Sequence, residues 1–215
     1  MSATRVSPFH GALAVRDAHW AERDGMRVAR QLRDDDSARA SVLGLVDLSY
    51  LARTGFKGPG AAALLHSLGH ELPPPNGWKP GASGGLIARL ATSEFFVEDL
   101  NGNATVAAID RALARPPADV CPVPRQDAAL ALTGSRVNEL LVQTCNVNFQ
   151  EVGSGAVVLT MMVGVAVQVI SQTIGGIACQ RIWCDPSFAP YLWNTLAEIA
   201  EELGGGPVGT QVLVD

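Results

Sequence analysis

The stretch that decides the fold, residues 44–65, reads GLVDLSYLARTGFKGPGAAALL. Its middle part, over 50–57, combines the apolar Leu51 and Phe56 with the polar Arg53 and Lys57 and predicts a short, half-exposed strand. Gly58 then permits a sharp exit from the strand. Alanine and leucine favour a helix over 61–68, which Gly69 would end. The segment therefore predicts a strand, a glycine turn and a helix.

The same order occurs a second time. DAALALTG, residues 127–134, is an apolar run short enough for a buried strand, and SRVNELL follows its glycine. Gly58 and Gly134 are each followed, six and seven positions later, by a Leu-Leu pair. The tandem predicts a pseudo-symmetric α+β core built from two similar lobes. A chance recurrence of so simple a pattern remains the alternative.

A long uncharged segment lies between Glu151 and Arg181. A membrane-spanning helix needs about 20 predominantly apolar residues, but polar residues and glycines interrupt this run. Valine dominates it, and β-branched side chains favour strands. We predict strands over 156–163 and 165–171, a turn at 175–176 and another strand through IACQRIWC. A buried β-meander is thus favoured over a membrane span.

The C-terminal part predicts one more helix. Asp185 is a candidate N-cap, and residues 191–203 carry apolar side chains on one face. The glycine-rich run over 204–209 then reads as the end of this helix and a turn. Trp183 and Trp193 flank the helix start, and we predict that both lie in the core.

Composition indicates an ordered globular chain, with 215 residues, 47% hydrophobic residues, 17% charged residues and a net charge of −5. We expect a single domain over 1–215, with an N-terminal arm over 1–40 and two packed lobes at about 40–120 and 121–215. No cluster of Lys or Arg suggests a nucleic-acid partner. The N-terminal sequence does not resemble a signal peptide, so we expect a cytoplasmic protein without membrane attachment.

Common catalytic and metal-binding motifs are missing from the sequence. The four cysteines, at 121, 145, 179 and 184, lack zinc-ligand spacing, and we expect buried, reduced thiols. His66 and His70 have helical spacing, but Gly69 separates them. There is no phosphate-binding loop, dinucleotide fingerprint or serine-nucleophile motif. We therefore predict no catalytic, cofactor-binding or metal-binding residue in this chain.

Several segments together carry a family resemblance. GLVDLSYLARTGFKGPGAAALL and ALALTGSRVNELL resemble two strand–glycine–helix units of the folate-binding aminomethyltransferase superfamily, which includes the glycine-cleavage T-protein. SPFHGAL and GGLIARLATSEFFVED fall in the same order. The resemblance covers roughly residues 7–203. It implies a folate-binding aminomethyltransferase-like α+β fold with a C-terminal β-meander and helix.

One departure from that family bears on chemistry. In the T-protein, a Gly-Gly pair is followed by an Asp-Asp that touches the folate and assists methylene transfer. Here the segment that starts at Gly84 and Gly85 continues with Ala88 and Arg89. Alanine cannot ionise and arginine stays protonated, so neither can act as a carboxylate acid or base. We also expect this chain to lack the further domains that complete the folate site, and the lysine-glycine-cysteine signature of the iron–sulfur assembly branch is missing.

The segment QRIWCDPSFAPYLWNTLAEIAEELGGG resembles the γ subunits of heterotetrameric sarcosine oxidases. The resemblance implies a non-catalytic subunit of a complex that demethylates an N-methyl amino acid with O2. It also implies that FAD and FMN lie on a β subunit or at its interface, NAD and tetrahydrofolate on a large α subunit, and zinc on a small δ subunit. The α subunit would be the main contact, with Trp78 in the loop PPPNGW at the centre of the interface. The alternatives are a stand-alone folate-dependent aminomethyl or methyl transferase or demethylase, and a regulatory or orphan binding protein.

Overall fold

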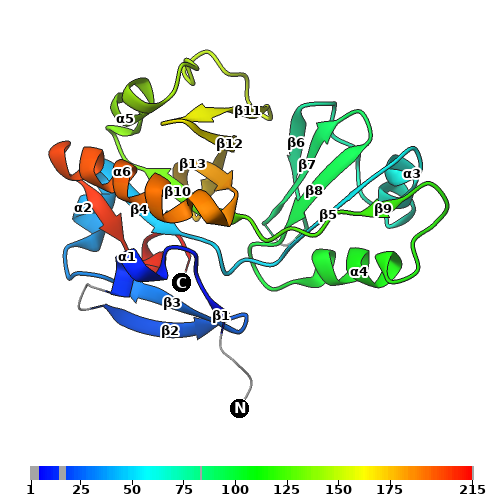
Figure 1. Ribbon diagram of the computed structural model, residues 1–215, viewed down its shortest axis with the longest axis horizontal. Helices are drawn as coiled ribbons and strands as arrows, with labels where there is room; N and C mark the ends of the chain where they lie inside the picture. Colours follow the sequence, from blue (N-terminus) through cyan, green and yellow to red (C-terminus); the bar gives the residue numbers. More distant parts are fainter. Residues whose placement is uncertain (1–4, 15–17, 83, 215) are drawn as a thin grey trace. The chain divides into compact units, whose positions relative to one another are not determined.

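The computed structural model describes residues 5–14, 18–82 and 84–214 (Figure 1). The chain forms two compact units. Unit 1 comprises Met1–Tyr50, Asp127–Ser154 and Val158–Asp215, and unit 2 comprises Leu51–Gln126 and Gly155–Val157. These bounds differ from the expected lobes at 40–120 and 121–215, because the first fifty residues belong to the same unit as the C-terminal part. That the units form one domain stays a prediction.

Unit 2 is built on a five-stranded antiparallel sheet in the order β6-β7-β8-β5-β9. Its elements are β5 (Arg53–Lys57), α3 (Ala61–Ser67), β6 (Gly77–Pro80), β7 (Leu86–Ala91), β8 (Glu94–Glu98), α4 (Ala104–Leu113) and β9 (Cys121–Pro122). The rings of Phe56 and Phe95 stack in its core with centroids 5.4 Å apart. The expectation of a half-exposed β5 was wrong. This strand lies inside the sheet, between β8 and β9, and Thr54–Phe56 are buried.

Unit 1 contains a six-stranded sheet in the order β11-β12-β13-β10-β4-β14. Its strands are β4 (Gly44–Asp47), β10 (Ala128–Thr133), β11 (Val157–Met162), β12 (Val165–Ile174), β13 (Ile177–Cys184) and β14 (Gly206–Val208). The uncharged segment forms the predicted meander, with a turn at Gly175 and Gly176. The glycine-rich run over 204–209 is more than a turn, because β14 pairs with β4 as a parallel edge strand.

The N-terminal residues are part of this unit's core. A three-stranded sheet in the order β1-β3-β2 is made by β1 (Arg5–Val6), β2 (His19–Arg23) and β3 (Met26–Gln31). The remaining elements are α1 (His10–Ala14), α2 (Asp36–Leu43), α5 (Val137–Thr144), η1 (Pro186–Phe188), α6 (Ala189–Glu202) and η2 (Thr210–Val212). Phe9 stacks on Trp193 with ring centroids 4.7 Å apart. Within the described part of the expected arm over 1–40, Phe9, Leu13, Ala29 and Leu32 lie in this core and anchor the segment, whereas Val6 is 58% exposed.

Both strand–glycine–helix segments have the expected local geometry. Gly58 has φ +124°, and a Cβ there would lie 2.2 Å from the carbonyl oxygen of Asp119. Gly134 has φ +112°, and its Cβ would lie 2.5 Å from the carbonyl oxygen of Val42. Only glycine fits such a backbone in so little space. Strand order also repeats, as β6-β7-β8-β5 and β11-β12-β13-β10. The pseudo-symmetry of two lobes stays a prediction.

The expectations for Asp185, Trp183 and Trp193 are confirmed. Asp185 Oδ1 accepts a 2.8 Å hydrogen bond from the Ser187 amide and caps η1, directly before α6. Trp183 and Trp193 are buried. Three of the four free thiols are buried, but Cys121 is exposed, because it lies on the short strand β9. In the described parts of the chain, no helix is long and apolar enough to cross a membrane.

Candidate functional site

The segment that resembles the carboxylate-bearing segment of the aminomethyltransferases includes β7. Gly85 precedes the strand, and a Cβ there would sit 2.0 Å from the carbonyl oxygen of Glu98. Ala88 is fully buried. Arg89 Nε donates a 3.1 Å hydrogen bond to the carbonyl oxygen of Thr92, and its guanidinium lies 5.5 Å from the centre of the Phe95 ring. Neither side chain can exchange a proton with a bound folate, so the residues present do not fit that role.

Two buried carboxylates follow on the neighbouring strand, and sequence reasoning missed both. Glu98 ends β8 and pairs with Arg53 across the sheet, with Nε and Oε2 3.0 Å apart. Asp99 Oδ2 accepts a 2.9 Å hydrogen bond from the Val106 amide in the first turn of α4. The ion pair between Arg53 and Glu98 ties β8 to β5, and the hydrogen bond from Val106 to Asp99 fixes the first turn of α4. Their sequence signal is the acidic pair that ends the apolar run FFVED.

A buried polar cluster occupies one face of the six-stranded sheet in unit 1. Arg181 on β13 is 1% exposed, and its Nη1 donates a 3.2 Å hydrogen bond to Gln172 Oε1 on β12. Its guanidinium lies 4.8 Å from the centre of the Trp183 ring. Cys179 Sγ donates to the Gln172 carbonyl oxygen at 3.3 Å. Side chains alternate along a strand, so this face is opposite to the one that bears Ile182 in the main core.

Tyr50 belongs to the same electrostatic environment. It is 2% exposed, and within the described residues its hydroxyl has no hydrogen-bond partner. Burial raises its pKa to about 12; the charges of Arg23 and Arg181 lower the pKa, and those of Asp24 and Asp47 raise it. The phenol therefore stays protonated at neutral pH and cannot act as a base.

The buried thiols are equally inert. Burial raises the pKa of Cys179 to about 11, although the charge of Arg181 opposes the shift. Burial, with the charges of Asp127 and Asp185, raises the pKa of Cys184 to about 12. The thiolate is the reactive form of cysteine, and it is scarce at neutral pH when the pKa is this high. The cluster offers a buried guanidinium and amides, but these tyrosine and cysteine side chains supply no nucleophile or base.

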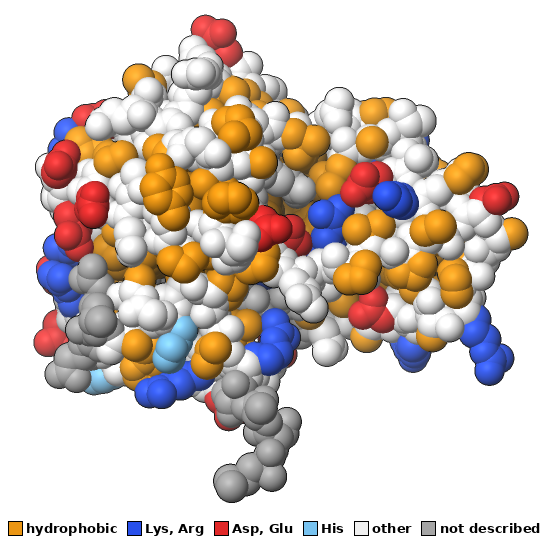
Figure 2. Space-filling view, in the orientation of Figure 1, with side chains coloured by type: hydrophobic (Ala, Val, Ile, Leu, Met, Phe, Trp, Pro, Cys, Tyr) orange, Lys and Arg blue, Asp and Glu red, His pale blue; other side chains and the backbone are white. Residues whose placement is uncertain are grey.

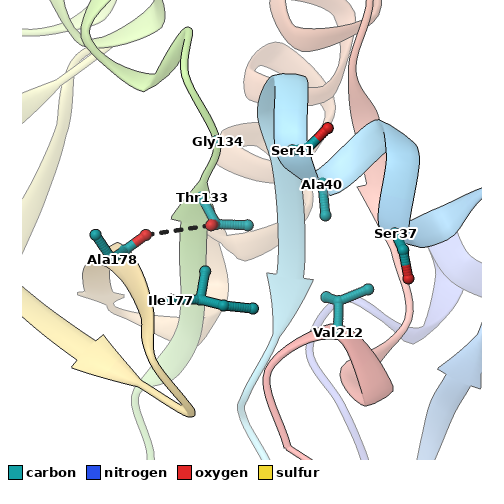
Figure 3. Close-up of a pocket in the computed structure, with 8 residues that line it drawn as sticks. All are labelled: Ser37, Ala40, Ser41, Thr133, Gly134, Ile177, Ala178 and Val212. Carbon is teal, nitrogen blue, oxygen red and sulfur yellow. Dashed lines mark hydrogen bonds between the residues drawn. The ribbon is translucent and has the colours of Figure 1, made fainter.

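A separate pocket of about 370 Å³ opens where α2, β10, β13 and η2 meet (Figure 3). In Figure 3 the side chains of Ile177 and Val212 point toward one another across this space, and Thr133 Oγ1 donates to the Ala178 carbonyl oxygen at 3.2 Å. Its lining contains no ionisable side chain and consists of Ser37, Ala40, Ser41, Thr133, Gly134, Ile177, Ala178 and Val212. Such a pocket can hold an apolar group but offers no acid or base.

His66 and His70 are separated as expected. Helix α3 ends at Ser67, and Gly69, with φ +83°, separates His66 from His70. Over residues 5–14, 18–82 and 84–214, no group of three or more His, Cys, Asp or Glu side chains could hold a metal ion. Trp78, expected at the centre of an interface, lies half-buried on the edge strand β6, and its buried Nε1 lacks a partner among the described residues.

Comparison with solved structures identifies the fold. The glycine cleavage system aminomethyltransferase T from Bartonella henselae superposes with a TM-score of 0.78 and 15% identity, over 98% of this chain and 61% of that chain. This chain thus spans about three fifths of the aminomethyltransferase's length. A heterotetrameric sarcosine oxidase from Corynebacterium sp. U-96, solved with pyrrole 2-carboxylate, superposes with a TM-score of 0.68 and 19% identity, over 95% of this chain and 98% of that chain.

The sequence itself matches no protein-family model and no curated protein. The likeness is therefore one of structure, and it establishes the folate-binding aminomethyltransferase-like α+β fold.

Proposed function

We propose that this chain is the γ-type subunit of a heterotetrameric, sarcosine oxidase-like complex. The complex would convert an N-methyl amino acid, O2 and water into the demethylated amino acid, formaldehyde and H2O2. With tetrahydrofolate as acceptor, the one-carbon unit would leave as methylenetetrahydrofolate, and no water would be consumed. This chain would have no catalytic residue and would act as a structural subunit.

One observation carries the proposal. The chain aligns end to end with a chain of a heterotetrameric sarcosine oxidase, covering 95% of its own length and 98% of the other's. A folate-dependent transferase needs a group that can accept or donate a proton, whereas Ala88 and Arg89 occupy the positions of the family's carboxylates. Glu98 and Asp99 are engaged by Arg53 and by α4. A chain with this fold but without carboxylates free for proton transfer at these positions fits a structural subunit best.

The partners follow from the same proposal. We assign FAD and FMN to a β-type subunit, NAD and tetrahydrofolate to a large α-type subunit, and zinc to a small δ-type subunit. The α-type subunit would be the main contact of this chain. We place the complex in the cytoplasm, apart from nucleic acid and membranes.

A stand-alone folate-dependent transferase or demethylase is the second candidate. The TM-score of 0.78 with the aminomethyltransferase favours it. It would need an acid or base other than residues 88 and 89, supplied by a side chain outside the groups described above.

Purification of the tagged chain from its native host tests the proposal. We expect native mass spectrometry to show a particle of four different chains. The particle should have flavin absorbance and should produce H2O2 with sarcosine or a related N-methyl amino acid. A lone chain in the purified fraction, or a chain that binds tetrahydrofolate tightly by itself, would overturn it.

A further inference from the structure

Unit 2 contains two asparagines that are each followed by glycine, Asn76–Gly77 and Asn101–Gly102. Asparagine is among the thermolabile residues of proteins. Its side-chain carbonyl carbon can be attacked by the amide nitrogen of the next residue, and glycine has no Cβ to obstruct this approach. The two pairs have the same chemistry, but the structure holds them in different ways.

The first pair is fixed at the start of β6. The Gly77 amide donates a 3.0 Å hydrogen bond to the Pro74 carbonyl oxygen, and the Asn76 carbonyl oxygen accepts a 2.8 Å hydrogen bond from the Val157 amide. Gly77 is buried and is the cross-strand partner of Arg89 on β7. The nitrogen that would attack is therefore engaged, and a reaction here requires local opening of the strand.

The second pair lies in the loop that links β8 to α4 (Figure 1). Asn101, Gly102 and Asn103 are all exposed. Gly102 has φ +78°, and a Cβ there would have no atom within 4 Å. Among the described residues, no hydrogen-bond acceptor engages the Gly102 amide. The attacking nitrogen and the space around it are therefore open in the folded chain.

We propose that Asn101 is a site of spontaneous deamidation in the folded protein. Water or hydroxide removes the proton of the Gly102 amide, and the nitrogen forms a bond to Asn101 Cγ. The bond between Cγ and the side-chain nitrogen breaks, and this nitrogen leaves as ammonia with a proton from solvent. The product is a succinimide ring, which a water molecule opens at either carbonyl to give aspartate or isoaspartate at position 101. Water is the only co-reactant.

The new carboxylate would lie close to a structural one. Asp99 is 1% exposed and accepts a hydrogen bond from the Val106 amide. Helix α4 begins at Ala104, and negative charge is favourable near a helix N-terminus. The aspartate product should therefore keep the fold. Isoaspartate adds a methylene group to the main chain, and the exposed loop before α4 has room for it.

Deamidation would also divide the protein into charge forms. Acidic and basic side chains are scattered over the face shown in Figure 2, and the net charge of the chain is −5. Each deamidated copy carries one more negative charge, so ion-exchange chromatography separates it from fresh copies. Because the reaction needs only this loop and water, it does not depend on the proposed function.

Ageing of the tagged chain purified from its native host tests the proposal. The protein is kept in warm, mildly alkaline buffer, and peptide mass spectrometry follows both asparagines over time. We expect Asn101 to convert at least about tenfold faster than Asn76, because only Asn76 requires local opening. In urea the two rates should come within about threefold of each other, because neither loop keeps its native contacts there.

Matched variants assign the acidic form to one residue. Asn101→Gln should remove this form, because the longer side chain disfavours ring closure, whereas Asn76→Gln should leave it in place. Gly102→Ala should slow the conversion, because its Cβ obstructs the attacking nitrogen; thermal melting checks its fold, since φ +78° is unfavourable for alanine. Asn101→Asp, which carries the new carboxylate from the start, should melt within about 2 °C of the wild type.

Three results would overturn the proposal. The first is a folded chain in which Asn101 converts no faster than Asn76, or converts only in urea. The second is an acidic form that persists in Asn101→Gln. The third is a folded Gly102→Ala variant that ages at the wild-type rate, which would exclude attack by this amide.

Discussion

The buried ion pair between Arg53 and Glu98 gives the sharpest test of the view that unit 2 uses its carboxylates structurally. The two residues are direct cross-strand partners on β5 and β8, and their side chains are 4% and 1% exposed. Glu98→Gln keeps the side-chain shape but leaves the guanidinium charge of Arg53 in a buried site without its carboxylate. Removing one member of such a pair typically costs about 3–5 kcal/mol of folding free energy. For a chain of this size, that corresponds to a fall in Tm of roughly 6–20 °C.

Urea unfolding and thermal melting measure this cost. Two further variants serve as its comparisons. Glu94→Gln is the matched control on the same strand, because Glu94 pairs with Arg125 at 2.8 Å with side chains 33% and 15% exposed. More exposed pairs contribute about 0–1 kcal/mol. The double variant Arg53→Met with Glu98→Leu should recover most of the stability, because apolar replacement of a whole buried pair is often neutral.

Two results would refute the reasoning. If Glu98→Gln costs no more than Glu94→Gln, the pair does not tie β8 to β5. If the folded double variant assembles into the complex but lowers its turnover per flavin, Glu98 takes part in the chemistry and our structural assignment is wrong.

Three further predictions concern other parts of the chain. Gly134→Ala should destabilise by about 2–4 kcal/mol in urea unfolding, because its φ is +112° and the new Cβ would meet the Val42 carbonyl oxygen at 2.5 Å, whereas Gly153→Ala, with no atom within 4 Å, should change little. Because folding raises the pKa of Tyr50 from 10.0 to about 12, the folded state holds this proton more tightly. The contribution of Tyr50 to the free energy of unfolding should therefore be fully present below pH 10 and fall by on the order of 2–3 kcal/mol as pH rises toward 12. Tyr50→Phe should remove this loss, and an unchanged pH profile in that variant would contradict the assignment. Calorimetric titration of the isolated chain with tetrahydrofolate should show no tight site, and sub-micromolar binding would count against a non-catalytic role.

Local sequence signals predicted the elements whose structure depends on neighbouring residues. Gly58 and Gly134 mark tight exits from strands into helices, because their backbone conformation excludes other residues. The meander followed from a valine-rich run broken at Gly175 and Gly176. Asp185 capped the start of the last helical segment, as its position suggested.

Features that depend on distant residues were not predictable in the same way. β14 consists of Gly206, Pro207 and Val208, a composition typical of a turn, and it becomes a strand only because β4 offers an open edge. The core role of Phe9 depends on stacking with Trp193. No periodicity within either segment encodes such pairings.

The candidate site likewise contains residues whose role the sequence predicts and residues whose role depends on distant neighbours. Family resemblance predicts that Ala88 and Arg89 stand where relatives have carboxylates, and this stays a prediction that can be made from the sequence alone. The roles of Glu98 and Asp99 require knowledge of what lies across the sheet and at the start of α4. Arg181 did carry a signal: a single charge at the end of a long uncharged run is a candidate for a buried guanidinium.

The parallel pairing of β14 with β4 has a consequence for synthesis on the ribosome. Unit 2 is almost continuous in sequence, so it can fold soon after its residues emerge. Unit 1 completes its sheet later, because β4 stays open on one edge until Gly206–Val208 are translated about 160 residues after it. An exposed strand edge invites wrong pairing, so a nascent chain is a natural client for chaperones during that interval. Chains truncated before β14 should therefore be degraded rather than assembled, which would restrict incorporation into a complex to fully translated copies.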